Sequence, residues 1–300
     1  MADNIRRSLT ANHDCLIVTV DAQEVLQNLM SQLSVMPSPM LHLAQACLGS
    51  LLVQAINDPQ EEEKIELQWM TDGPFGTLHA RSEGLGKVRG NIQKPELILP
   101  QLENSLGQGI FQCRKTKDSL TSQGNVASQG YVNLDLQEYF QSSEQKVCGV
   151  GLSVHFSLDE SSPNKNNPVK IDRALGYLLH LLPNDKGVDP RRIEAFDRHL
   201  KNLGPISEWL LEGNSEKRTQ VMAHYLSGEP NIRTLHSEPV VLHCSCSKEK
   251  VLRAISLLTA RERNHFLKKD DEKEPDYEVR CEFCSKLYKV SPAEVRNLFS

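Results

Sequence analysis

The sequence predicts an α+β protein with a large N-terminal domain built on a mixed α/β sheet, a helical linker and a small cysteine-rich C-terminal domain. Three observations predict this. The N-terminal part mixes alternating and helical apolar patterns without a regular strand–helix–strand order. Short amphipathic segments interrupted by Gly and Pro follow, and the C-terminal part holds two close pairs of cysteines. We therefore place the domains at residues 1–187, 188–239 and 240–300.

Length and composition agree with a folded, water-soluble chain. The 300 residues are 39% hydrophobic and 24% charged, which is typical of globular domains with a sizeable core. No apolar run approaches the roughly 18 residues of a membrane span, and Met1–Arg7 leads into no apolar signal-peptide core. We expect a cytoplasmic protein that does not bind a membrane.

In the first domain, the apolar pattern predicts helices at Ala22–Leu33 and Pro39–Ile56, the second with an apolar face. The face of the second helix consists of Leu41, Ala44, Cys47, Leu48 and Leu51. Strands are predicted at Lys64–Met70, Thr77–Ala80, Lys87–Ile92 and Val147–Phe156. Val169–Leu182 is apolar enough to pack on the sheet, and a turn at Pro183–Gly187 closes the domain.

The segment 188–239 predicts short helices. Asp189-Pro190 is a good helix start, and Gly204-Pro205 stops the pattern. Apolar positions between these signals recur every three or four residues, at Ile193, Phe196, Leu200 and Leu203. Two shorter stripes contain Ile206, Trp209, Leu210 and then Val221, Met222, Tyr225, Leu226. Such pieces need a partner surface, so the segment is either an ordinary docked linker or a metastable element that exposes apolar surface when released.

Four cysteines near the C-terminus predict one zinc site. Cys244 and Cys246 form C-S-C, and Cys281 and Cys284 form C-E-F-C. Zinc accepts four thiolates in a tetrahedron, and two close pairs from distant segments supply such a set. A domain this small buries little apolar surface, so zinc binding and folding become one equilibrium. Converting the thiolates to disulfides would expel the metal and unfold the domain.

Other interpretations of the cysteines are weaker or remain open. A closed four-cysteine site is also what a permanent structural staple needs. His243 precedes Cys244 but finds the coordination sphere already filled, and no strand–helix–strand fold follows Cys284 as a thioredoxin-like enzyme requires. No catalytic triad order or phosphate-binding loop is visible, so we expect no enzyme. The scattered Cys15, Cys47, Cys113 and Cys148 are best explained as small buried hydrophobic residues.

The charge disfavours a nucleic-acid partner. The net charge is -5, and residues 244–300 carry 12 Lys and Arg against 10 Asp and Glu. Zinc with four thiolates adds about -2, so the cysteine-rich domain is nearly neutral and has no basic stripe for phosphates.

Several motifs spread over nearly the whole chain carry a family resemblance. In order they are D-G-P-F-G-T-L-H-A from Asp72, V-R-G from Val88, G-Y-V-N-L from Gly130, Y-F-Q-S-S-E-Q from Tyr139, G-Y-L-L-H-L-L-P from Gly176, H-C-S-C-S-K-E-K from His243 and V-R-C-E-F-C-S-K-L-Y from Val279. With these motifs the chain resembles the redox-regulated, thirty-three-kilodalton heat-shock holdase family of bacteria.

The resemblance implies a switch. In the family, the cysteines matching Cys244, Cys246, Cys281 and Cys284 hold one zinc ion in the reduced, poorly active protein. Oxidation forms the disulfides Cys244–Cys246 and Cys281–Cys284, zinc leaves, and the C-terminal domain and linker lose structure. The exposed surfaces then bind unfolding client proteins without ATP, usually as a homodimer. The alternative is a constitutive zinc-stapled binding or adaptor protein without redox switching.

Two features depart from the family pattern. Lys268–Asp276 resembles a charged insertion between the cysteine pairs, and its effect should be small because loop length costs closure entropy only slowly. Ser285 follows the C-x-x-C where such turns often place glycine for a positive φ, so we expect strain that makes zinc easier to lose.

Overall fold

The computed structural model describes residues 2–57, 63–84, 86–100, 105–160, 168–185, 187–259, 261–262 and 276–299. Contacts divide the chain into an N-terminal unit, Met1–His243, and a C-terminal unit, Cys244–Ser300. Each unit is described by itself below. Of the charged segment Lys268–Asp276, all but Asp276 lies outside the described residues.

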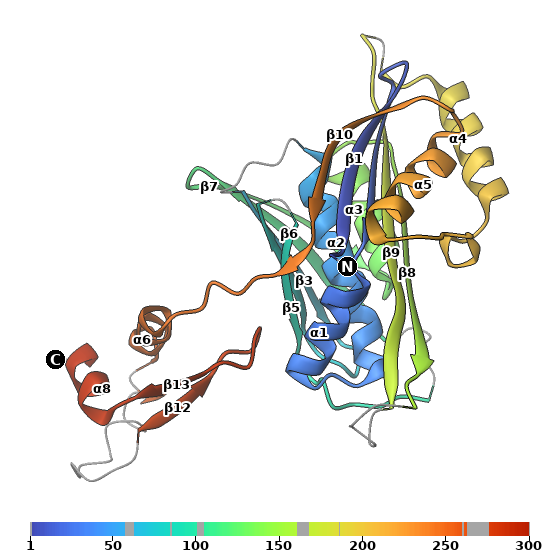
Figure 1. Ribbon diagram of the computed structural model, residues 1–300. Helices are drawn as coiled ribbons and strands as arrows, with labels where there is room; N and C mark the ends of the chain where they lie inside the picture. The colour runs from blue at the N-terminus through green and yellow to red at the C-terminus, as the bar shows by residue number, and fades with distance from the viewer. Residues whose placement is uncertain are drawn as a thin grey trace. The chain divides into compact units, whose positions relative to one another are not determined.

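Two largely antiparallel sheets form the frame of the N-terminal unit (Figure 1). In sheet order, the five-stranded sheet consists of β10 (Ile232–Pro239), β1 (Asn4–Thr10), β2 (Cys15–Asp21), β9 (Val169–Leu181) and β8 (Cys148–Leu158). The six-stranded sheet consists of β11 (Val241–Leu242), β5 (Lys87–Ile92), β4 (Leu78–Glu83), β3 (Lys64–Thr71), β6 (Gly109–Lys117) and β7 (Leu120–Ser128). Only the short β11 pairs in parallel, with β5.

Helix α2 (Pro37–Ile56) lies between the two sheets and contacts β2, β8 and β9 of one and β3, β4 and β5 of the other. It is long and apolar enough to cross a membrane, but 89% of that stretch is buried inside the fold. The single apolar face predicted for it is therefore incomplete, because apolar residues surround the helix and Leu41 of that face is only partly buried. Helices α1 (Gln23–Leu33) and α3 (Val132–Ser142) complete the layer.

The predicted α+β class is confirmed, as are both helices and the four strands of the first domain, with ends shifted by a few residues. Val169–Leu182 does more than pack on the sheet, since β9 is itself a strand inside it. Strands β1, β2, β6 and β7 and helix α3 had no counterpart among the predictions.

The predicted helices of segment 188–239 are present as α4 (Pro190–Leu203), the 3-10 turn η1 (Ile206–Glu208) and α5 (Ser215–Ser227). Asp189 caps α4 by accepting a hydrogen bond from the Arg191 N–H, and Gly204 follows its last residue. The prediction is wrong for Ile232–Pro239, which forms β10 and pairs with β1. Leu210 is also no part of an apolar stripe, because 84% of it is exposed.

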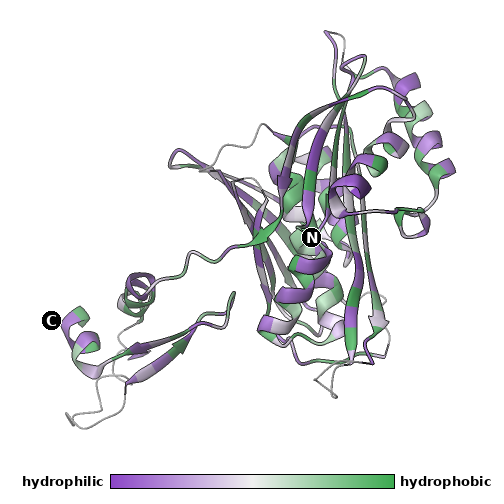
Figure 2. Cartoon of the chain, viewed as in Figure 1, coloured by the Kyte–Doolittle hydropathy of each residue, from purple (hydrophilic) through white to green (hydrophobic). Residues whose placement is uncertain are grey.

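Segment 188–231 packs on the outer face of the five-stranded sheet and creates a second hydrophobic core there. Cys15, Ile17, Leu175, Leu179 and Leu181 come from the sheet, and Ile206, Trp209, Leu211, Met222, Ala223 and Leu226 come from the segment. Helix α4 contributes only partly buried side chains. Figure 2 shows hydrophilic and hydrophobic residues on different sides of α4 and α5, as expected for helices that lie on a surface.

The C-terminal unit is small. It contains α6 (Lys248–Ser256), the antiparallel hairpin of β12 (Tyr277–Arg280) and β13 (Leu287–Val290), and α8 (Pro292–Phe299). Its described core has three buried apolar residues, Ile255, Val290 and Val295. Lys248 of α6 and Glu294 of α8 form an ion pair at 2.6 Å. So little buried apolar surface indicates that this unit needs a further cross-link to be stable.

Candidate metal centre

The two cysteine pairs are presented by different local structures. Cys244 and Cys246 lie in an extended stretch that ends where Ser247 caps α6, with its hydroxyl accepting a hydrogen bond from the Lys250 N–H. Cys281 and Cys284 lie in the turn of the β12–β13 hairpin. This turn is closed by backbone hydrogen bonds from Cys281 N to Lys286 O (2.9 Å) and from Ser285 N to Cys281 O (2.8 Å).

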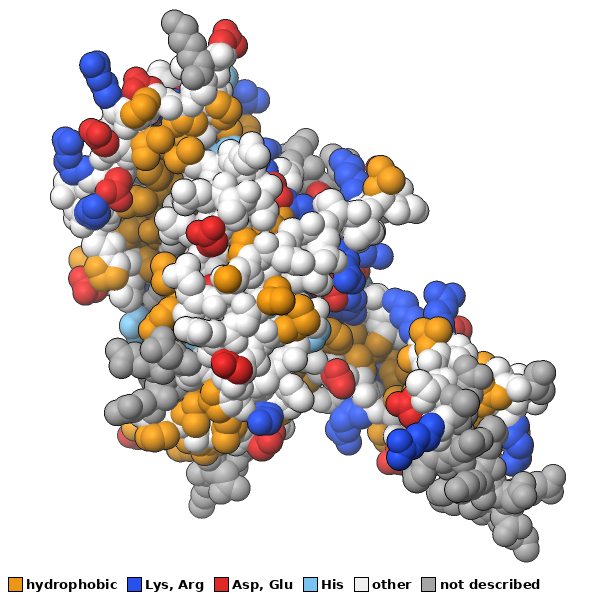
Figure 3. All heavy atoms as spheres, turned by 180° about the vertical axis from the view of Figure 1, so that it is seen from behind, with side chains coloured by type: hydrophobic (Ala, Val, Ile, Leu, Met, Phe, Trp, Pro, Cys, Tyr) orange, Lys and Arg blue, Asp and Glu red, His pale blue; other side chains and the backbone are white. Residues whose placement is uncertain are grey.

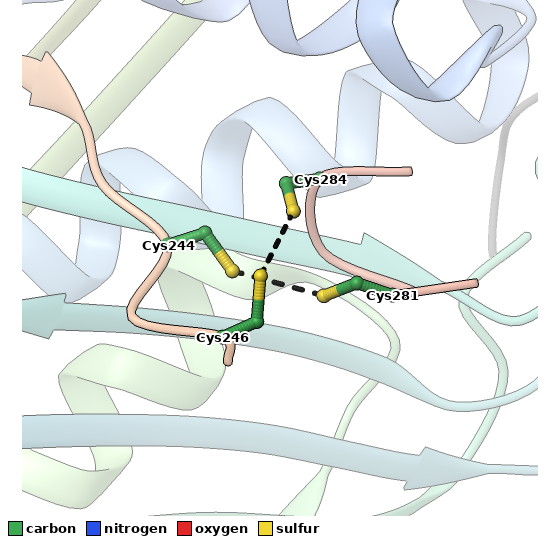
Figure 4. A group of neighbouring side chains, drawn as sticks. All are labelled: Cys244, Cys246, Cys281 and Cys284. Atoms are coloured by element: carbon green, nitrogen blue, oxygen red, sulfur yellow. Dashed lines mark hydrogen bonds between the residues drawn. The ribbon is translucent and has the colours of Figure 1, made fainter. Parts of the chain in front are cut away.

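The four sulfur atoms converge on one point (Figure 4). The Sγ atoms of Cys244 and Cys281 are 3.7 Å apart, those of Cys246 and Cys284 are 3.4 Å apart, and all four lie within 4.8 Å of one another. Zinc–sulfur bonds of about 2.3 Å in a regular tetrahedron place the sulfurs about 3.8 Å apart, whereas a disulfide needs about 2.05 Å. The arrangement therefore fits a reduced set of four ligands around a metal ion.

The surroundings favour thiolates unequally. Burial raises the pKa of Cys246, but the Tyr288 hydroxyl, which donates to its Sγ at 3.0 Å, and the neighbouring thiols outweigh burial and lower this pKa to about 7. Burial raises the pKa of both Cys281 and Cys284 in the metal-free protein. A bound cation would draw all four towards the thiolate form, because metal ions deprotonate coordinating thiols.

The turn contains the backbone strain that the sequence predicts. Ser285 has φ 55°, in the left-handed region that costs a residue with a Cβ about 1 kcal/mol or more. We therefore expect Ser285→Gly to stabilise the folded hairpin by up to about 1 kcal/mol and to slow zinc release to a chelator several-fold. A chromogenic zinc dye would measure this rate. Ser245, which lies outside the positive-φ positions, provides the matched control: Ser245→Gly should bring no such gain, and an equal gain would argue against strain at Ser285.

The predicted cysteines are thus brought together, and they form the metal-ligating cluster found among the described residues. His243 belongs to the N-terminal unit, where its N–H donates to Val88 O, and it is not part of the cluster. Sequence reasoning missed Tyr288. One signal points to Tyr288: it lies four residues after Cys284, on the strand β13 that returns from the turn.

The four other cysteines are separate from the cluster. Cys15, Cys47 and Cys113 are buried and Cys148 is partly buried. Burial raises the pKa to about 11 for Cys113 and to about 12 for the other three. These thiols stay protonated at neutral pH, so their interpretation as small hydrophobic residues agrees with the structure.

Comparisons with known proteins cover the whole chain. Residues 3–291 match the protein family described as "Hsp33 protein". Two curated proteins named "33 kDa chaperonin" are each 26% identical to this chain. The match to the protein from Enterococcus faecalis covers 99% of this chain and 96% of that protein. The match to the protein from Thermus thermophilus covers 98% of this chain and 86% of that protein. A crystal structure of a 33 kDa chaperonin, an Hsp33 homologue from Thermotoga maritima, shares the fold with a TM-score of 0.79 at 22% identity, covering 99% of this chain and 98% of that one.

Proposed function

Because the chain belongs to the Hsp33 protein family, we propose that it is an ATP-independent holdase chaperone that oxidation activates. Its curated relatives are named chaperonins, which supports a chaperone role that acts on unfolding client proteins. The redox switch and its residues are our proposal. We infer that the reduced protein holds one Zn²⁺ through Cys244, Cys246, Cys281 and Cys284 in the cytoplasm.

One observation carries the proposal: four reduced sulfurs converge in a unit with three buried apolar residues in its described core. Zinc, when bound, supplies the cross-link that such a small core lacks. Oxidation of each pair of thiolates, Cys244–Cys246 and Cys281–Cys284, would form a sulfur–sulfur bond and pass two electrons to hydrogen peroxide, which takes up two protons from the solvent and becomes two water molecules. A disulfide sulfur is a poor ligand for zinc, because the thiolate is the form that binds metals.

The connection to the N-terminal unit is short. Cys244 follows directly after His243, whose N–H bonds to Val88, and β11 before it pairs with β5 over Val241 and Leu242 only. So short a strand is held by few hydrogen bonds, and an unfolded C-terminal unit would fray it readily. Unfolding would thus spread from the cysteines into the residues that precede them.

Segment 188–231 is the element that we propose is released. Helix α4 has no fully buried residue, and the segment is held mainly by the apolar side chains around Trp209 and Met222. On α5 the Arg218 Nε donates to Asp21 Oδ2 at 2.6 Å, and the Thr19 hydroxyl donates to the Thr219 carbonyl. The release of segment 188–231 would expose the outer face of the five-stranded sheet. This face is the kind of apolar surface that binds unfolded chains.

The β8 edge of this sheet, beside the docked segment, is already open. A groove of about 700 Å³ runs between α3, the start of β8 and α4. Val147 and Val150 beside or in β8 and Ile193, Phe196 and Leu200 of α4 give it an apolar lining, whereas α3 contributes Gln137 and Gln141. Figure 3 shows orange side chains gathered along the molecule beside the charged side chains of α4. The docked segment therefore covers the sheet incompletely, which supports a surface that is ready to enlarge.

The test is light scattering from a heat-unfolded client protein, mixed with this protein either reduced and zinc-loaded or pretreated with peroxide at raised temperature. Suppression only after oxidation, and reversed by reductant, is the expected result. Equal suppression in both states would make zinc a permanent staple and the chaperone constitutive. No suppression in either state, with the protein still folded, would favour an adaptor instead.

A further inference from the structure

Strand β7 is an open sheet edge of unusual composition. It lies at the end of the six-stranded sheet and pairs only with β6 among the described residues (Figure 1). Its nine residues, L-T-S-Q-G-N-V-A-S, include no charged residue and no proline, and most of them are exposed. Open edges are templates for pairing with other chains, so proteins usually block them with charges, proline, bulges or shortness.

The other three edges of the two large sheets have such blocks. Strand β10 carries Arg233, Glu238 and Pro239, and its pairing with β1 shifts register between Arg7 and Ser8. Strand β8 has a register shift between His155 and Phe156. Strand β11 is only two residues long. Among the edges of the two large sheets, β7 is therefore the one that has no charge, proline, register shift or extreme shortness in the part of the chain that the structure describes.

Strand β7 is also held in a fixed position. Its inner face packs against α3, where a Cβ on Gly124 would lie 2.8 Å from the Tyr139 ring. A two-residue turn, Asp118-Ser119, with both φ angles positive, joins it to β6. In hairpins with such turns the flanking pair, here Lys117 and Leu120, exchanges both backbone hydrogen bonds, and bonded pairs then alternate.

This alternation identifies the open backbone groups. The residues that point N–H and C=O towards β6 are the even-numbered ones from Leu120 to Ser128. Those that point the same groups away from the sheet are Thr121, Gln123, Asn125 and Ala127. Four consecutive ladder positions are thus available to a further strand.

We propose that β7 captures an extended segment of an unfolded polypeptide, which adds to the sheet as a further antiparallel or parallel strand. The biological meaning of this site rests on the proposed chaperone function. Main-chain hydrogen bonds read no side-chain sequence, so an edge of this kind suits a protein that must bind many different clients.

The flanking side chains define the segment that fits. On the outer face Ala127 pairs with Ile110, which pairs with Met70, and Ile110 and Met70 are 48% and 38% exposed. At the other end, the exposed Lys117 has no ion pair among the described residues, whereas Lys115 of β6 pairs with Glu144 and Arg114 pairs with Glu66. The expected occupant is therefore an extended segment with alternate apolar residues and without net positive charge.

The edge alone should bind weakly. A few main-chain hydrogen bonds offset the cost of ordering the client only partly. A second contact on the outer face of the five-stranded sheet, opened by oxidation, would make the two sites act together and raise the overall affinity. Binding at β7 should therefore be detectable in the reduced protein at high client concentration and strong in the oxidised one.

The pair Asn125→Pro and Asn125→Ala tests the site. Proline removes an outward N–H and keeps every bond to β6, whereas alanine keeps that N–H, and both variants lose the same hydrogen bond from Gln123. With reduced, carboxymethylated lactalbumin as a permanently unfolded probe, we expect Asn125→Pro to bind about tenfold more weakly than Asn125→Ala or more. Peroxide-induced zinc release should be the same in both variants.

Hydrogen exchange of the unmodified protein gives a second readout. The amides of Thr121, Gln123, Asn125 and Ala127 should exchange more slowly with the probe bound, in both redox states at saturating probe. This exchange measurement still tests the β7 site if Asn125→Pro fails to fold. It also tests the site if the oxidised protein suppresses no aggregation and the proposed chaperone function fails. Equal binding by the two variants, or unchanged exchange at saturation, would overturn the site. If these amides exchange slowly without the probe, and more slowly at higher protein concentration, β7 pairs with a second copy of this chain and the proposed client site is overturned.

Discussion

The Trp209→Ala variant is expected to hold unfolding proteins while its cysteines are still reduced and its zinc is bound. Trp209 is 5% exposed and lies in the centre of the second core. Its ring stacks on Tyr177 at 5.8 Å and meets Tyr225 edge-on at 5.8 Å, while its Nε1–H donates to the Leu203 carbonyl at 3.1 Å. One side chain thus joins the sheet, α4 and α5.

The expected size of the effect follows from this position. Truncating a buried tryptophan to alanine costs about 3–5 kcal/mol, which changes the balance between docked and released segment by about 100-fold or more. Light scattering from a heat-unfolded client under reducing conditions would measure the gain, and a zinc dye would confirm that the metal stays bound. Leu210→Ala, at the exposed neighbouring position, should behave like the unmodified protein. A Trp209→Ala protein that melts earlier yet stays inactive until oxidised would contradict release of the segment as the active step.

Removing zinc from the reduced protein is expected to unfold the C-terminal unit and leave the N-terminal unit folded. Three buried apolar residues in its described core stabilise the unit little, whereas zinc binding by a four-ligand site is worth about 10–16 kcal/mol at neutral pH. The N-terminal unit has its own large core around α2, to which the cysteine cluster contributes nothing. Hydrogen exchange after treatment with a chelator would show fast exchange on β12 and β13 and slow exchange on β3 and β9.

Single substitutions refine this experiment. Cys246→Ser removes the ligand that accepts the Tyr288 hydrogen bond and should reproduce the effect of the chelator. Cys148→Ser changes a cysteine outside the cluster and should keep both the metal and the slow exchange of β13. If β13 stays protected in the chelated protein or in Cys246→Ser, the unit folds without metal and the switch must act by another route.

Local signals in the sequence predicted the elements that depend on neighbouring residues. Asp189 and Gly204 mark the ends of α4 because caps act within a few residues. The spacing of Cys281 and Cys284 likewise predicts a ligand-bearing turn, since both ligands come from one hairpin. The burial of α2 on all sides could not be predicted, because it depends on two sheets that come together only in the fold.

Long-range pairing explains the errors. The strand Ile232–Pro239 was predicted as part of a helical linker because its partner β1 is more than two hundred residues away and leaves no trace in the local pattern. Tyr288 was missed for a related reason. Its hydroxyl meets Cys246 only when the hairpin returns beside the first cysteine pair, 42 residues away along the chain.

The pairing of β1 with β10 has a consequence for the synthesis of the protein. Strand β1 is made more than two hundred residues before Ile232–Pro239, which lie near the end of the N-terminal unit. At about 5–20 residues per second, the growing chain waits roughly 10 to 45 seconds for the strand that covers this side of β1. During that interval each new molecule carries an open strand of its own, so the nascent polypeptide is itself exposed to the aggregation that the finished protein is proposed to prevent.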